Sequence, residues 1–88
     1  MKELRKEERI PHNVCLQYSI YGDLSGKTYN CVTIDISNRG LGIISSYPIE
    51  FGQFIEFEDT GNNVPTLNAV VQWSAPVGVN YRAGLFLF

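Results

Sequence analysis

The stretch YNCVTIDISNRGLGIISS, residues 29–46, contains two runs of alternating residue types on either side of a short polar turn. Alternation with a period of two is typical of a β-strand, because successive side chains point to opposite faces. The turn, Asn38-Arg39-Gly40, has the composition of a tight chain reversal. These residues therefore predict a hairpin with strands at Tyr29–Ser37 and Leu41–Ser46.

The first strand of this hairpin is predicted to have one apolar face and one polar face. Its core-facing residues are expected to be Val32, Ile34 and Ile36, and its outward residues Thr33, Asp35 and Ser37. This pattern places Asp35 and Ser37 close together on the outer surface, at the end of the strand.

Four further segments show the same alternation, and clusters of turn-forming residues separate them. The predicted strands are Val14–Tyr21, Gln53–Glu58, Thr66–Trp73 and Val79–Phe88. In the first of these, the buried face is expected to carry Val14, Leu16, Tyr18 and Ile20. In the second, Ile55 and Phe57 are expected to face inward and Phe54, Glu56 and Glu58 outward, and in the third Trp73 is expected to face inward. Six strands joined by short turns favour an all-β fold, a closed antiparallel barrel, because closure removes exposed sheet edges. We expect the barrel to span residues 13–88, after a flexible N-terminal arm of residues 1–12.

The composition favours one globular domain in the cytoplasm. The apolar fraction of 44% and the charged fraction of 18% are typical of a folded domain. No run of eighteen apolar residues predicts a membrane span, and the first ten residues lack the apolar centre of a secretory signal. Cys15 and Cys31 are accordingly expected to be free thiols, and with His12 they offer too few ligands for a metal site.

The basic residues are concentrated at one end of the chain. The formal net charge is −2, and residues 1–10 contain four of the seven Lys and Arg residues. The rest of the chain has three basic and six acidic side chains. Binding of a long nucleic acid depends on many basic contacts to phosphates, so this distribution disfavours it. A basic cluster of this size suits a small anionic ligand better.

Arg5 and Arg9 lie within that basic segment, with three residues between them. In an extended chain their Cα atoms would be about 13 Å apart. That spacing allows two guanidinium groups to bind different parts of one dinucleotide-sized ligand. Arginine suits this ligand class because its planar group binds phosphate with two hydrogen bonds, contacts the O6 and N7 atoms of guanine and stacks on rings. The alternative interpretation is a solvated, charged tail.

Asp35, Ser37 and Gly40 form the second group of candidate binding residues. A carboxylate at this strand end can accept hydrogen bonds from guanine N–H groups, and a neighbouring hydroxyl can contact a base or a phosphate. Gly40 would permit a positive φ in the turn and a close approach of ligand to backbone. Arg39, in the same turn, is a candidate for a secondary ligand contact. The alternative is that these side chains only shape the turn.

Together the two groups resemble the motifs of the PilZ domain family. The pattern R-x-x-x-R at Arg5–Arg9, followed after a strand by D-x-S-x-x-G at Asp35–Gly40, is similar to the paired motifs of that family. Three later segments are similar to its remaining strands, at residues 52–57, 69–73 and 81–86. The resemblance covers nearly the whole chain, from about Arg5 to Phe88.

The resemblance implies a bacterial receptor for the second messenger cyclic di-GMP. The residue inventory leads us to expect no catalytic residue, metal or other cofactor. It implies that the two motif arginines clamp guanine and phosphate, and that Asp35, Ser37 and Gly40 form the wall of the site on the barrel. It further implies a stand-alone adaptor that signals to a protein partner.

Two features depart from the family pattern. Members often have a further arginine where this chain has Leu4, so we expect one ligand molecule per site, with Leu4 and Lys6 as secondary contacts. Members commonly continue into a C-terminal helix, whereas this sequence ends at Phe88, so little or no helix is expected. An apolar barrel end left exposed in this way would be covered by self-association, giving a homo-oligomer, or by a partner.

Three other functions stay open at this point. A PilZ-like module that binds no nucleotide would act through protein contacts alone. A barrel that binds single-stranded nucleic acid is disfavoured by the acidic balance and by the lack of exposed aromatic residues clustered with lysines. An enzyme is disfavoured because the sequence shows one histidine, no glycine-rich phosphate loop and no metal-binding cluster.

Overall fold

The computed structural model describes residues 10–11, 13–58 and 67–88 of the chain. Within these ranges it contains strands and no helix. The strands are β1 (Ile10–Pro11), β2 (Cys15–Ile20), β3 (Tyr29–Ile36), β4 (Gly40–Ser45), β5 (Phe54–Glu58), β6 (Leu67–Val77) and β7 (Asn80–Leu87). The six predicted strands correspond to β2 to β7, and β6 continues past its predicted end at Trp73.

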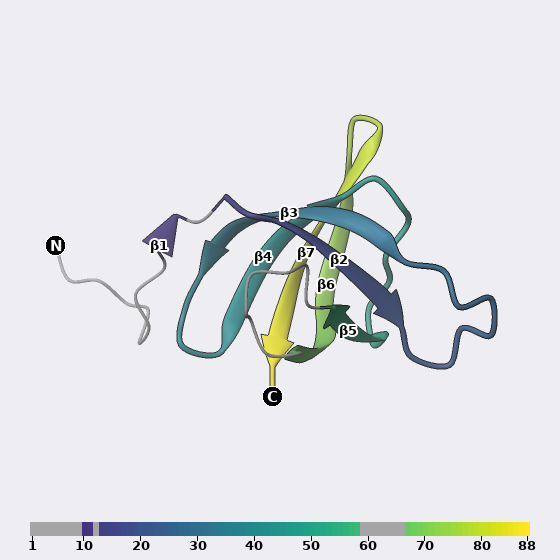
Figure 1. The fold of residues 1–88 in the computed structure, drawn as a ribbon. Helices are drawn as coiled ribbons and strands as arrows, with labels where there is room; N and C mark the ends of the chain where they lie inside the picture. Colours follow the sequence, from purple (N-terminus) through teal and green to yellow (C-terminus); the bar gives the residue numbers. More distant parts are fainter. Residues whose placement is uncertain (1–9, 12, 59–66) are drawn as a thin grey trace, which may run out of the picture.

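The strands close into a barrel. Neighbouring strands pair antiparallel in the order β1-β3-β2-β5-β6-β7-β4. An additional pairing between β3 and β4 closes the six strands from β2 through β7 into a ring. Figure 1 shows these strands around a common interior, with the β6–β7 hairpin extending beyond the others. Closure satisfies the backbone of a small sheet that would otherwise have two exposed edges. The predicted fold, an all-β antiparallel barrel of six strands, is confirmed.

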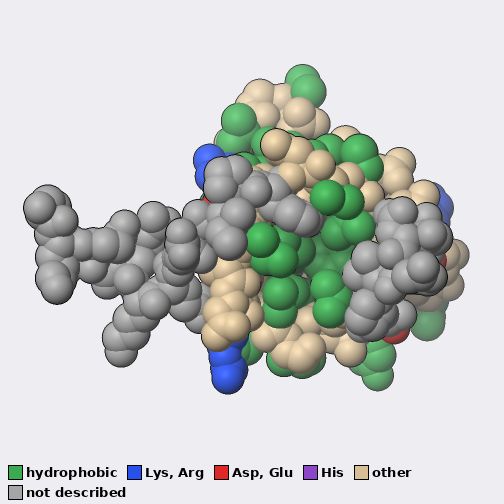
Figure 2. Space-filling model, turned by 60° about the vertical axis from the view of Figure 1, so that its left-hand side comes forward, with side chains coloured by type: hydrophobic (Ala, Val, Ile, Leu, Met, Phe, Trp, Pro, Cys, Tyr) green, Lys and Arg blue, Asp and Glu red, His purple; other side chains and the backbone are tan. Residues whose placement is uncertain are grey.

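Alternate residues of each strand fill the interior, as expected for a barrel of this size. On β5, Ile55 and Phe57 are buried, whereas Phe54, Glu56 and Glu58 face solvent, as the alternation predicted. Part of the apolar content nevertheless stays outside. Figure 2 shows hydrophobic side chains gathered near the middle of one face, with the Lys and Arg side chains in view at its margin.

Three tyrosines contact one another in and beside the core: Tyr18 is fully buried, Tyr29 is partly buried and Tyr47 is exposed. The hydroxyl groups of Tyr18 and Ser45 are 2.7 Å apart, and the backbone N–H of Tyr47 donates to the same serine oxygen. Tyr29 stacks on Tyr47, with ring centroids 4.0 Å apart, and its hydroxyl donates to a carboxylate oxygen of Asp23. Burial raises the pKa of Tyr18, so its hydroxyl stays protonated. Polar groups in this part of the core are therefore paired, as buried polar groups must be.

The predicted faces of β3 are wrong in part, because a bulge interrupts the alternation between Thr33 and Asp35. Thr33 is fully buried, whereas Val32, expected inside, is 41% exposed. The Thr33 hydroxyl accepts a hydrogen bond from Val14 N and donates to Val14 O, which explains why a polar side chain occupies the interior. After the bulge, Ile36 packs against the core, as predicted.

A second bulge, in β6 between Val71 and Trp73, overturns another expectation. Val71 is fully buried, but Trp73 is 48% exposed instead of facing inward. A bulge adds one residue to a strand and so turns the following side chain to the other face. The largest side chain of the chain therefore lies on the outside of the barrel.

The two cysteines are free thiols, as predicted. Cys15 is exposed, whereas Cys31 lies in the core on the neighbouring strand β3. Burial, with a smaller contribution from Cys15, raises the pKa of the Cys31 thiol to about 12. The folded protein therefore retains this proton at pH values where the unfolded chain releases it.

The free energy of unfolding should accordingly fall in alkaline solution. A folded-state pKa above the unfolded value gives a stability that is intact below pH 9 and is lost progressively toward pH 12. Between pH 9 and pH 10 we expect a loss of about 1 kcal/mol, measured by urea unfolding. Cys31→Ala should remove the larger part of this loss and leave the part that comes from Tyr18 and Tyr29, whose pKa values are also raised. Cys15→Ala should retain the loss. A Cys31→Ala protein with the same pH dependence as the wild type would contradict the assignment.

Candidate functional site

The turn that joins β3 to β4 is closed by the residues of the predicted motif. Ser37 N donates to Gly40 O, and Gly40 N donates to the Ser37 hydroxyl oxygen, at 2.9 and 3.1 Å. Among the described glycines, those with positive φ are Gly22, Gly26, Gly52 and Gly78, so the positive φ anticipated at Gly40 is not adopted. The motif serine thus fixes the hairpin, and the exposed Arg39 lies at its tip.

Asp35 belongs to a row of residues that crosses four strands on the outer surface. The row consists of Asp35 on β3, Gly42 on β4, Gly84 on β7 and Trp73 on β6. Each member is the direct cross-strand partner of the next. Because neighbouring strands are about 4.8 Å apart, the row spans roughly 14 Å. A carboxylate and an indole therefore flank two positions that have no side chain.

The two glycines give room to the side chains at either end of the row. A Cβ at position 42 would lie 2.8 Å from Asp35 Oδ1. A Cβ at position 84 would lie 2.6 Å from Trp73 Cε2 and 2.9 Å from Trp73 Cδ1. All three distances are shorter than a Cβ atom tolerates, so a side chain at Gly84 would displace the indole. The carboxylate lies over Gly42, and the indole lies over Gly84.

A surface hollow of about 210 Å³ adjoins this row. It is lined by Arg39, Gly40, Gln72, Trp73, Gly84, Leu85 and Phe86. The hollow brings the motif residue Gly40, from the β3–β4 turn, to the same surface as Trp73, from β6. Arg39 adds a positively charged side chain to the lining of the hollow, so the rim is suited to an anion.

The predicted arginines lie outside the described residues, as do Leu4 and Lys6. The strand that follows Arg9 is described, and it pairs with β3 so that Pro11 is opposite Asp35. The described residue opposite Asp35 on the neighbouring strand is therefore only two positions after Arg9 in the sequence. This register supports a common location for the two motifs.

The sequence interpretation missed three residues of this surface, namely Gly42, Gly84 and Trp73. The alternation on β6 pointed to an inward Trp73, and the bulge that turns it outward left no clear signal in a single sequence.

Among the residues that the structure describes, no group of three or more His, Cys, Asp and Glu could hold a metal ion. The same part of the chain contains no helix long and apolar enough to cross a membrane.

Comparison with known proteins agrees with these features. The family model of the PilZ domain matches residues 3–86. No curated protein matches the chain. The matched range includes both motifs, the glycine row and all of the barrel strands except the last residue of β7, Leu87. The chain therefore belongs to the PilZ domain family.

Proposed function

We propose that the protein is a bacterial, cytoplasmic receptor for cyclic di-GMP, which binds against the row from Asp35 to Trp73. The observation that supports the proposal is the pairing of Pro11 with Asp35, because Pro11 follows the R-x-x-x-R segment by only two residues in the sequence. Family membership supports the same class of ligand. The chain acts as a binding module and adaptor rather than as an enzyme.

The chemistry of the surface suits a ligand with two guanines and two phosphates. The Asp35 carboxylate can accept hydrogen bonds from the N–H groups of one guanine. The half-exposed Trp73 indole offers a face on which a base can stack. Gly42 and Gly84 are buried beneath these two groups, so they act by leaving room for the carboxylate and the indole to lie on the surface. Arg5 and Arg9 supply the positive charge that the phosphates require.

Calorimetric titration with cyclic di-GMP tests this proposal. We expect one ligand molecule per chain, since Leu4 occupies the position of the additional family arginine. Arg9→Ala should weaken binding by about 1–3 kcal/mol, the contribution of one bidentate guanine contact. Lys27→Ala is the matched control, because it also removes one positive charge but lies in the exposed β2–β3 loop. It should leave the affinity unchanged.

Two results would contradict parts of the proposal. The absence of binding heat with the wild-type chain would refute the receptor function and favour a module that acts through protein contacts alone. A stoichiometry of two ligand molecules per chain would leave the receptor function intact but refute the role given to Leu4.

A further inference from the structure

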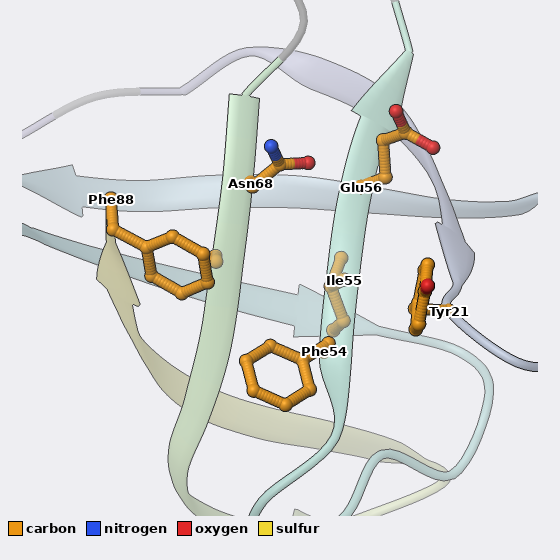
Figure 3. Close-up of a pocket in the computed structure, with 7 residues that line it drawn as sticks. Tyr21, Phe54, Ile55, Glu56, Asn68 and Phe88 are labelled. Atoms are coloured by element: carbon orange, nitrogen blue, oxygen red, sulfur yellow. The ribbon is translucent and has the colours of Figure 1, made fainter.

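A second surface, away from the Asp35–Trp73 row, combines an apolar pocket with acidic residues. The pocket has a volume of about 400 Å³ and is lined by Tyr21, Phe54, Ile55, Glu56, Asn68, Ala69 and Phe88. Figure 3 shows Glu56 and Asn68 at one end of the pocket and Phe54 at the other. We call this surface the aromatic face.

The aromatic face exposes an apolar area as large as the largest apolar patch of a typical folded domain. Tyr21, Phe54 and Phe88 are 81%, 52% and 64% exposed. Since each aromatic residue can bury about 150–250 Å², these fractions leave roughly 300–500 Å² open to solvent. Contiguous apolar patches of this size on a monomer are often functional.

The pocket is held in place by the barrel. The rings of Phe54 and Phe88 meet edge to face, with centroids 5.9 Å apart. Phe88 N donates to Asn68 O, and Tyr21 N donates to Phe54 O, so the backbone of each exposed aromatic residue is fixed to a strand. A surface that is already ordered loses little conformational entropy when a partner binds.

The charges around the pocket decide what can cover it. Glu56 and Glu58 follow Phe54 as the next two outward residues of β5, and both are exposed. The residues opposite them on the neighbouring strands are Ser19, Gln17 and Asn68, so none of these described neighbours is basic. The carboxylates repel an anionic ligand. Two copies of the chain joined through this face would bring their carboxylates together, so a second copy is also disfavoured.

We propose that the aromatic face binds an amphipathic helix of a partner protein, with an apolar anchor residue followed by basic residues. Outward residues of a strand are about 7 Å apart, and helical residues four positions apart are about 6 Å apart along the axis. A helix lying along β5 with its anchor near Phe54 therefore brings its residues at positions i+4 and i+8 to Glu56 and Glu58. Helix-in-groove recognition uses this arrangement of anchors.

This inference names the class of protein partner that the proposed adaptor would bind, namely a protein with an amphipathic helix. It rests on that part alone, because the aromatic face and the nucleotide surface have no lining residue in common. Its test therefore uses no nucleotide. Loss of cyclic di-GMP binding and loss of helix binding are separate results.

The probe is a fluorescein-labelled, alanine-rich helical peptide with one Phe and with Arg four and eight residues later. Fluorescence anisotropy should show that it binds at least tenfold more tightly than the same peptide with Glu in place of both Arg residues. Phe54→Ala should weaken binding at least tenfold, as expected for a central anchor contact. Glu56→Lys should remove most of the preference between the two peptides, because it leaves one basic and one acidic side chain, Glu58, to face the two peptide charges. Glu50→Gln, which also removes a negative charge outside this pocket, should change little.

Four results would overturn the proposal. They are the absence of binding, equal affinity for the Arg and Glu peptides, unchanged binding by Phe54→Ala, and a wild-type dimer in sedimentation equilibrium that Phe54→Ala dissociates. The last result would assign the face to a second copy. Because Phe54 and Glu56 are exposed, both variants should retain the wild-type circular dichroism spectrum.

Discussion

Tyr18→Ala is expected to lower the free energy of unfolding by about 3–5 kcal/mol. Tyr18 is fully buried on β2, where its ring packs against Tyr29 and Phe57, with centroids 5.5 and 6.2 Å away. Truncation removes these contacts and leaves a cavity. It also deprives Ser45 of its hydroxyl partner. Urea unfolding followed by circular dichroism measures the loss, which is a large part of the roughly 4–13 kcal/mol expected for a domain of this size.

Tyr18→Phe separates packing from hydrogen bonding. It keeps the ring but removes the hydroxyl group that lies 2.7 Å from Ser45 Oγ. The serine oxygen still accepts a hydrogen bond from Tyr47 N, so we expect a loss of only about 1 kcal/mol. Equal losses for Tyr18→Phe and Tyr18→Ala would show that the hydrogen bond, not the aromatic core, holds this end of the barrel together.

The barrel could be predicted because most of its strands obey a simple alternation. On β2 and β5 the period-two pattern correctly identified buried Tyr18, Ile55 and Phe57. It failed at the bulges of β3 and β6, where one added residue shifts the pattern. The buried Thr33 depends on a partner at Val14, and a pairing between residues so far apart in sequence cannot be read from the local pattern.

Some residues of the candidate site could likewise be predicted from the sequence, and others could not. Asp35, Ser37 and Gly40 were identified because they lie close together in one motif. Gly42, Gly84 and Trp73 were not, because the row is assembled from β4, β7 and β6 only when the barrel closes. A glycine inside a strand is a weak sequence signal. Its role becomes visible only when the side chain lying over it is known.

Gly84→Ala is expected to weaken cyclic di-GMP binding about as much as Trp73→Ala, by about 1–3 kcal/mol or roughly 5- to 150-fold. The backbone of Gly84 does not have a positive φ, so alanine is not strained there. Its Cβ would instead overlap the indole of Trp73 and displace the stacking surface. Calorimetry measures the affinity. Emission from the single tryptophan reports both the displacement and the bound base.

A double-variant cycle shows whether Gly84 acts through the indole. If it does, Gly84→Ala combined with Trp73→Ala should bind no more weakly than Trp73→Ala alone, because the displaced group is already absent. Gly26→Ala is the control for a loss of stability, since Gly26 has a φ of 69° that strains alanine and no atoms within 4 Å of its added Cβ. It should lower stability without changing affinity. Additive losses in the double variant would instead mean that Gly84 contributes to the ligand surface directly, through its own backbone, and that Trp73 makes a separate contribution.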